Sequence, residues 1–118
     1  RTRACESLAS AILTTTHPTG YFTDAERAAF DELGEGVRMT RYGGDCYAYG
    51  LLAMGFIDLI VEAALKPWDV QALIPIIEGA GGKITTWDGG DAQHGGRVVA
   101  SGDPRVHEAA LAVLSRVR

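Results

Sequence analysis

Two acidic residues, Glu62 and Asp69, have the type and spacing to serve a charged ligand. Glu62 lies in the apolar run FIDLIVEAAL, residues 56–65, where an unpaired carboxylate would be costly to bury. Its carboxylate could accept hydrogen bonds from a substrate hydroxyl or ammonium group, or it could simply lie at the exposed end of a strand. Asp69 follows Pro67 and Trp68 at the start of an expected helix, where an acid can also act as a cap. For both residues the two interpretations stay open at this point.

A third candidate is the segment Gly43-Gly44-Asp45, which lies between a predicted short strand and a predicted helix. Two glycines let the backbone approach a ligand closely, and the first N–H groups of a helix can bind an anion. The same glycines can equally serve a turn with positive φ, and Asp45 can equally be a helix N-cap.

The elements that must position these residues alternate between strand and helix. Apolar and β-branched runs predict strands in the segments 8–16, 37–42, 56–65, 83–90 and 97–102. Helical patterns with marked ends occupy the segments 23–36, 46–55, 67–79 and 103–117. This alternation predicts a layered α/β fold with a largely parallel or mixed sheet flanked by helices.

Local signals refine several of these boundaries. Thr23 or Asp24 is expected to cap the first helix, and Asp103 is expected to cap the last one. The ring of Pro75 clashes with the carbonyl of residue 71, which predicts a kink in the third helix. A turn is expected at residues 17–20.

Ligands of such sheets bind at the carboxyl ends of the strands, where helix N-termini also point. Three strand–helix junctions qualify here, at residues 14–16, 43–45 and 62–69. The candidate residues named above lie in two of them, so the chemistry is expected there.

Composition excludes some classes of partner. With 118 residues, the chain is long enough for one modest domain. A net charge of −4 argues against nucleic acid, and no apolar run reaches the ~18 residues that a membrane helix needs. The two cysteines, Cys5 and Cys46, are expected to be reduced, buried thiols in a cytoplasmic protein. The sequence opens on Arg rather than Met, and we expect it to be a fragment or an excised domain.

The pair Trp68-Asp69, with the apolar helix that ends on Gly-Ala-Gly-Gly, resembles the C-terminal signature of the inositol monophosphatase-like family. The likeness extends over most of the chain, through GGDCYAYGLLAMGFIDLIVEAAL, KITTWDGG and VVASGDPRVHEAAL. The strings TRYGGDCYAY and PIIEGAGG are most similar to the histidinol-phosphatase branch. The resemblance implies a magnesium-dependent phosphatase and the C-terminal half of the family's α-β-α-β-α fold.

The resemblance also implies roles for individual residues. Asp69 matches a catalytic aspartate that ligates Mg²⁺ and contacts the substrate, and Glu62 matches a glutamate that binds the alcohol portion. Gly43, Gly44 and Asp45 match a substrate-binding turn, in which the position of Asp45 is small in inositol-specific members.

The family's other metal ligands are expected in an N-terminal half, in a glutamate pair and an Asp-Pro-x-Asp-Gly-Thr segment. Neither occurs in these 118 residues. Residues 1–118 are therefore expected to be a C-terminal substrate-recognition domain whose N-terminal metal-binding half is absent, and which is inactive alone. The resemblance further implies a possible homodimer.

The leading prediction is part of a histidinol-phosphate phosphatase of histidine biosynthesis. Asp45 and Glu62 would place two carboxylates beside the substrate, and such a pair favours a cationic alcohol. An inositol-phosphate or broad-specificity sugar-phosphate phosphatase is the alternative within the family. A non-catalytic binding or assembly domain is the alternative of another class.

Other conspicuous residues are given ordinary interpretations. Trp87-Asp88-Gly89-Gly90 is expected to be a turn rather than a second metal site. His94 is expected in a solvated loop and His107 on a surface helix, and neither belongs to a zinc pattern.

Overall fold

The computed structural model describes residues 1–17 and 19–118; Pro18, in the turn expected at 17–20, lies outside the described residues. Within these described residues, five strands form a single mixed sheet in the order β2-β1-β3-β5-β4. Strands β1, β2 and β3 are parallel, whereas β5 runs antiparallel to both β3 and β4. Their bounds are β1 Ile12–Thr15, β2 Met39–Tyr42, β3 Leu59–Leu65, β4 Lys83–Thr86 and β5 Gly96–Ser101. The prediction of a layered α/β fold is confirmed, with the sheet mixed.

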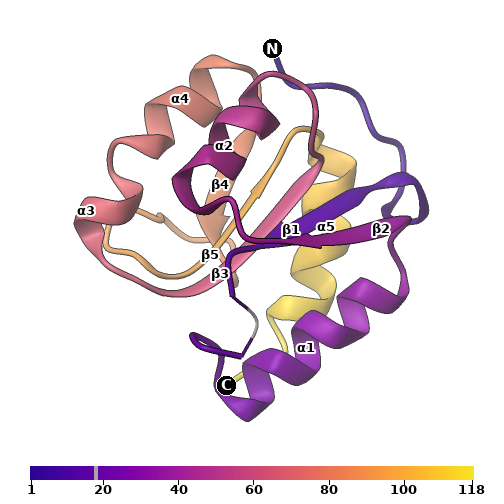
Figure 1. Ribbon diagram of the computed structural model, residues 1–118, viewed down its shortest axis with the longest axis vertical. Coiled ribbons are helices and arrows are strands. Elements are labelled where there is room, and N and C mark those ends of the chain that lie inside the picture. Colours follow the sequence, from indigo (N-terminus) through magenta and orange to yellow (C-terminus); the bar gives the residue numbers. More distant parts are fainter. Residues whose placement is uncertain (18) are drawn as a thin grey trace.

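Helices cover both faces of the sheet (Figure 1). In the described part of the chain, the buried apolar side chains form two clusters, one on each face. One face packs against α1 (Asp24–Glu35) and α5 (Pro104–Leu114), and the other against α2 (Asp45–Ala53) and α4 (Leu73–Gly79). Side chains of β3 alternate between the two cores, as a strand buried on both faces requires. Leu59 and Val61 lie in the first core and Ile60 in the second, so the side chain of Glu62 points to the α2 face.

Two helices begin as their sequences predict. Thr23 forms a capping box with Glu26: the Glu26 amide donates to the Thr23 hydroxyl at 3.2 Å, and the Thr23 amide donates to the Glu26 carboxylate at 2.8 Å. Asp103 caps α5 by accepting a hydrogen bond from the Arg105 amide at 2.8 Å, with Pro104 as the first helical residue.

The predicted kink divides the helix into two short helices. The chain forms α3 (Pro67–Val70) and α4 (Leu73–Gly79), separated by a turn at residues 71–72. The break falls at Gln71, the residue whose carbonyl the ring of Pro75 would meet in a continuous helix.

Three expectations are corrected. The strand expected from residue 8 begins only at Ile12, where the β-branched residues start, and Leu8–Ser10 form a 3₁₀ helix. His107 is fully buried, because α5 turns this face toward the sheet. Cys46 is exposed on α2, whereas Cys5 is buried as expected. Among the described residues, no helix is long and apolar enough to cross a bilayer.

Candidate functional site

A pocket of about 190 Å³ lies at the carboxyl ends of β1 and β3. Its walls are formed by Thr16, Tyr21, Asp45, Glu62 and Asp69, together with residues 63–65. The fold thus brings three carboxylates from two strand–helix junctions to one place. The catalytic, metal and substrate roles assigned to these residues stay predictions.

Glu62 is buried, with 5 % of its surface exposed, so the interpretation of an exposed strand end is wrong. Both of its carboxylate oxygens accept hydrogen bonds from Thr16, one from the hydroxyl at 3.0 Å and one from the amide at 3.4 Å. Burial raises the pKa of Glu62 above its ordinary value of 4.5, and the nearby Asp45 raises it further, against the lowering effect of the Thr16 hydrogen bonds. No ion pair neutralises Glu62 within residues 1–17 and 19–118.

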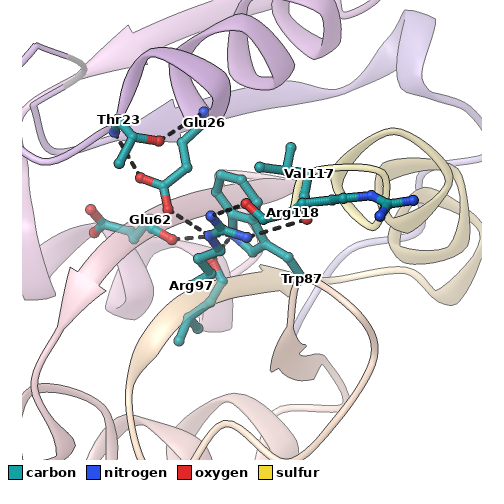
Figure 2. Close-up of polar contacts among 8 residues, drawn as sticks. Thr23, Glu26, Glu62, Trp87, Arg97, Val117 and Arg118 are labelled. Carbon is teal, nitrogen blue, oxygen red and sulfur yellow. Dashed lines mark hydrogen bonds and ion pairs between the residues drawn. The ribbon is translucent and has the colours of Figure 1, made fainter.

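The backbone of Glu62 is held from the opposite side of the sheet (Figure 2). The Trp87 indole N–H donates to the carbonyls of Glu62 and Val98, each at 3.2 Å. Directly after Glu62, the pairing of β3 with β5 shifts register, and Ala64 adopts a φ of 58°. A positive φ is unfavourable for a residue with a Cβ atom, so this irregular backbone at the pocket wall is held by its surroundings.

Arg97 supports Trp87 in turn. Its guanidinium lies 5.6 Å from the centre of the Trp87 ring and pairs with the Glu26 carboxylate. It also donates to the carbonyls of Val117 at 3.3 Å and Arg118 at 3.0 Å (Figure 2). Trp87 and Arg97 therefore lie on the side of the sheet away from the pocket, and the Glu62 carboxylate faces the pocket.

Asp45 is the first residue of α2 rather than its N-cap, which is Gly44. Gly43, Gly44 and Asp45 have φ values of 81°, 92° and 48°, so this turn needs the positive φ that glycine adopts readily. The Gly43 amide donates to the carbonyls of Thr15 and Thr16 at 3.1 and 3.0 Å. The turn thus directs the exposed Asp45 side chain into the pocket, while contact of the two glycines with substrate stays a prediction.

Asp69 uses one carboxylate oxygen as a cap and leaves the other free. Its Oδ2 accepts a hydrogen bond from the Lys66 amide at 2.8 Å, and no partner of Oδ1 is found among the described residues. The side chain is exposed and lines the pocket. The cap and the ligand interpretations of Asp69 are therefore compatible.

The donor set fits one part of a magnesium site. A carboxylate oxygen is the kind of ligand that Mg²⁺ prefers, and Asp69 offers one. Across the part of the chain that the structure describes, however, no group of three His, Cys, Asp or Glu side chains is placed to hold a metal ion. Asp69 could thus contribute to a metal site that needs ligands from elsewhere.

Two tyrosines at the site were missed by sequence reasoning. Tyr21 lines the pocket, and Tyr49 is 2 % exposed in the core between α2 and the sheet. Burial raises the pKa of Tyr49 well above 10, and the charge of Glu62 contributes next. The spacing of Asp45 and Tyr49 was a usable signal, since residues four apart lie on the same face of a helix.

Comparison with known proteins gives consistent matches. The model of the inositol monophosphatase family matches residues 1–118. The chain is 45% identical to the bifunctional phosphatase IMPL2, chloroplastic, of Arabidopsis thaliana over 93% of its length. It is 35% identical to a histidinol-phosphatase of Mycobacterium tuberculosis over 80% of its length. A solved structure of an inositol monophosphatase from Zymomonas mobilis is 42% identical, with a TM-score of 0.91 over 97% of this chain.

The same matches cover only part of each relative. The chain spans 34% and 36% of the lengths of the two curated relatives, and 46% of the solved structure. It therefore corresponds to about a third of the curated relatives it matches.

Proposed function

Because this chain belongs to the inositol monophosphatase family, we propose that it is the substrate-recognition part of a magnesium-dependent phosphatase that acts on histidinol phosphate. The family and the curated relatives are phosphatases by name. The choice of substrate, the metal and the division between two halves are proposals about the whole enzyme.

The negative charge of the pocket is the observation that supports histidinol phosphate as the substrate. Asp45, Glu62 and Asp69 line it, and no Lys, Arg or His side chain is found among its walls in the described part of the chain. Histidinol phosphate brings an ammonium group to such a site, whereas inositol phosphate brings only hydroxyl groups beside its phosphate. Charge-assisted hydrogen bonds are about twice as strong as neutral ones, which favours the cationic alcohol.

The three acidic residues of the pocket would have different roles according to their positions. Glu62, fixed by Thr16, and Asp45, at the start of α2, would accept hydrogen bonds from the amino-alcohol portion of the substrate. Asp69, at the other side of the pocket, would hold Mg²⁺ through its free oxygen. When bound, the metal supplies the positive charge that hydrolysis of a phosphate ester requires.

The remaining ligands of the metal would come from a part of the enzyme outside residues 1–118. Two facts support this division: the chain spans about a third of its curated relatives, and its described residues hold no three-ligand cluster.

The test compares two substrates in the full-length enzyme. We expect wild type to have the higher kcat/KM for histidinol phosphate, and Asp45→Asn to lower that value about 10-fold while changing the value for inositol 1-phosphate less than about 3-fold. Asp31→Asn, which alters an exposed acid of α1, is the matched control and should change neither value. Equal losses on the two substrates would exclude charge as the basis of selection.

A second substitution tests whether the site is catalytic at all. Asp69→Asn preserves the acceptor for the Lys66 amide but weakens the metal ligand, so kcat should fall on the order of 100-fold or more. Full activity of this variant would contradict the metal role. Absence of phosphatase activity in the wild-type full-length protein would instead favour a non-catalytic binding or assembly domain.

A wider substrate range has its own support. The solved relative from Zymomonas mobilis is called an inositol monophosphatase and is 42% identical to this chain. A wild-type enzyme that hydrolyses inositol 1-phosphate as well as histidinol phosphate would therefore be a broad-specificity member of the family.

A further inference from the structure

The Tyr49 hydroxyl is the one buried side-chain polar atom that lacks a hydrogen-bond partner in the described part of the chain. Its ring is packed in the second core, between α2 and the sheet. A buried hydroxyl left unpaired destabilises the fold, and a phenylalanine would fill the same space without that cost. An unpaired hydroxyl at such a place is typical of a functional site.

The hydroxyl and the Glu62 carboxylate lie on the same face of the sheet, because Tyr49 is packed in the core between α2 and the sheet and the Glu62 side chain points to the α2 face. Tyr49 influences the pKa of Glu62 by lowering it, after the larger raising effect of burial and the lowering effect of Thr16. In turn, the charge of Glu62 is the largest contribution after burial to the raised pKa of Tyr49. The two groups are thus neighbours whose present geometry falls short of a hydrogen bond.

Glu62 has room for another donor. A carboxylate offers about four acceptor sites, and in the described part of the chain the Glu62 carboxylate accepts two hydrogen bonds, both from Thr16. Carboxyl groups at Asp45 and Asp69 also face the pocket, and these accept hydrogen bonds rather than donate them when ionised. Among the buried groups near Glu62 in the described part of the chain, the Tyr49 phenol is therefore a donor still without a partner.

We propose that Tyr49 is a positioning residue that donates a hydrogen bond to Glu62 when a cationic substrate is bound, and so sets the preference for amino-alcohol phosphates. This inference rests on the proposed function. A bound ammonium group favours the ionised form of Glu62, and water leaves the pocket as the substrate enters. The buried carboxylate then needs donors from the protein, and a small rotation of the Glu62 side chain brings it to the phenol.

In this proposal the ring and the hydroxyl of Tyr49 have different roles. The aromatic ring accounts for packing, and a ring without a hydroxyl would do this equally well. The hydroxyl acts through Glu62, so its removal should affect binding of the cationic group and not the chemical step.

The experiment uses the full-length enzyme and the substitution Tyr49→Phe. We expect KM for histidinol phosphate to rise about 10-fold, with kcat and both constants for inositol 1-phosphate changed less than about 2-fold. Tyr47→Phe is the matched control, because Tyr47 lies two residues earlier on α2 and is 66% exposed. This control should leave both substrates unaffected.

A double substitution tests whether the effect passes through Glu62. In a Glu62→Gln background, Tyr49→Phe should produce no further change in the ratio of the two KM values. The thermal midpoint of Tyr49→Phe should equal or exceed that of wild type, since an unpaired buried hydroxyl has been removed. A lowered midpoint with equal losses on both substrates would show a purely structural role and overturn the inference.

The outcome for wild type separates this inference from the proposed function. Wild type without preference for histidinol phosphate would refute the proposed function and this inference with it. Wild type that has the preference, together with a Tyr49→Phe variant that retains it, would refute only the role of Tyr49.

Discussion

Asp58 and Glu62 are two buried carboxylates of one chain segment, yet the structure surrounds them differently. Asp58 directly precedes β3 and accepts two hydrogen bonds from the Arg3 guanidinium, at 2.8 and 2.7 Å, and one from the Ile12 amide at 2.8 Å. The Glu62 carboxylate, four residues later in β3, accepts hydrogen bonds only from Thr16 and pairs with no cation among the described residues.

The difference indicates that Asp58, before the amino end of β3, stabilises the fold, whereas Glu62, toward the carboxyl end of β3, is available to a ligand. Desolvating a carboxylate costs several kcal/mol, and a hydrogen-bonded guanidinium offsets that cost. At Asp58 the protein provides this offset itself. At Glu62 the hydrogen bonds from Thr16 offset only part of the cost and no cation is found among the described residues, so burial raises the pKa, and a cationic ligand could supply the missing charge.

The largest effect is expected from removing the cation at Asp58. Arg3→Met should lower the free energy of unfolding by about 4 kcal/mol, because it leaves Asp58 buried and unpaired. Urea titration of the full-length protein measures this. Arg27→Met is the matched control, since Arg27 pairs with an exposed Asp31 and should contribute under about 1 kcal/mol. Equal losses of stability in the two variants would show that Arg3 does not offset the burial of Asp58, and would contradict the contrast drawn between Asp58 and Glu62.

His107 extends the comparison to a buried base. It lies between two neutral hydroxyl groups, with Ser101 at 2.7 Å from Nδ1 and Thr85 at 2.9 Å from Nε2. Burial lowers its pKa from 6.5 to about 4. The folded state then binds fewer protons than the unfolded state, so stability present above pH 6.5 is lost as pH falls toward 4.

The expected loss from His107 is about 3 kcal/mol across this interval. Urea unfolding at pH 7, 5.5 and 4 measures it, with His94→Gln as a control in an exposed loop. The acid-induced loss should persist in His94→Gln and shrink in His107→Gln. A loss of the same size in His107→Gln would assign it to other groups.

The smallest effect on stability is expected at Glu62, with the opposite dependence on pH. Because its pKa is raised, the stabilising contribution of protonated Glu62 is complete below pH 4.5 and is lost as pH rises through the folded value. Glu62→Gln should therefore be within about 1 kcal/mol of wild type at pH 7, on the stabilising side. Its advantage should disappear near pH 4. Destabilisation as large as that of Arg3→Met would show that Glu62 is a structural carboxylate.

Local features of the fold could be predicted because they depend on neighbouring residues. The cap at Thr23, the cap at Asp103 and the break caused by Pro75 each involve groups within four positions of one another. The strand–helix junctions could be placed for the same reason, and parallel strands bring such junctions to one edge of the sheet.

Burial could not be predicted in the same way. His107 is on a helix whose own pattern resembles a surface helix, but its two hydroxyl partners come from β4 and β5. Cys46 and Tyr49 lie three positions apart on α2, and the packing against the sheet leaves the first exposed and buries the second. Such outcomes depend on contacts between segments that are distant in the chain.

The sequence by itself determined the alternation of strands and helices, the N-caps of the first and last helices and the family to which the chain belongs. These follow from short-range hydrogen bonding, side-chain shape and the order of motifs. Only the tertiary structure decided which carboxylates are neutralised and which are not. Arg3 reaches Asp58 across 55 positions and Thr16 reaches Glu62 across 46, and the charge of a buried group depends on the partners that folding brings to it.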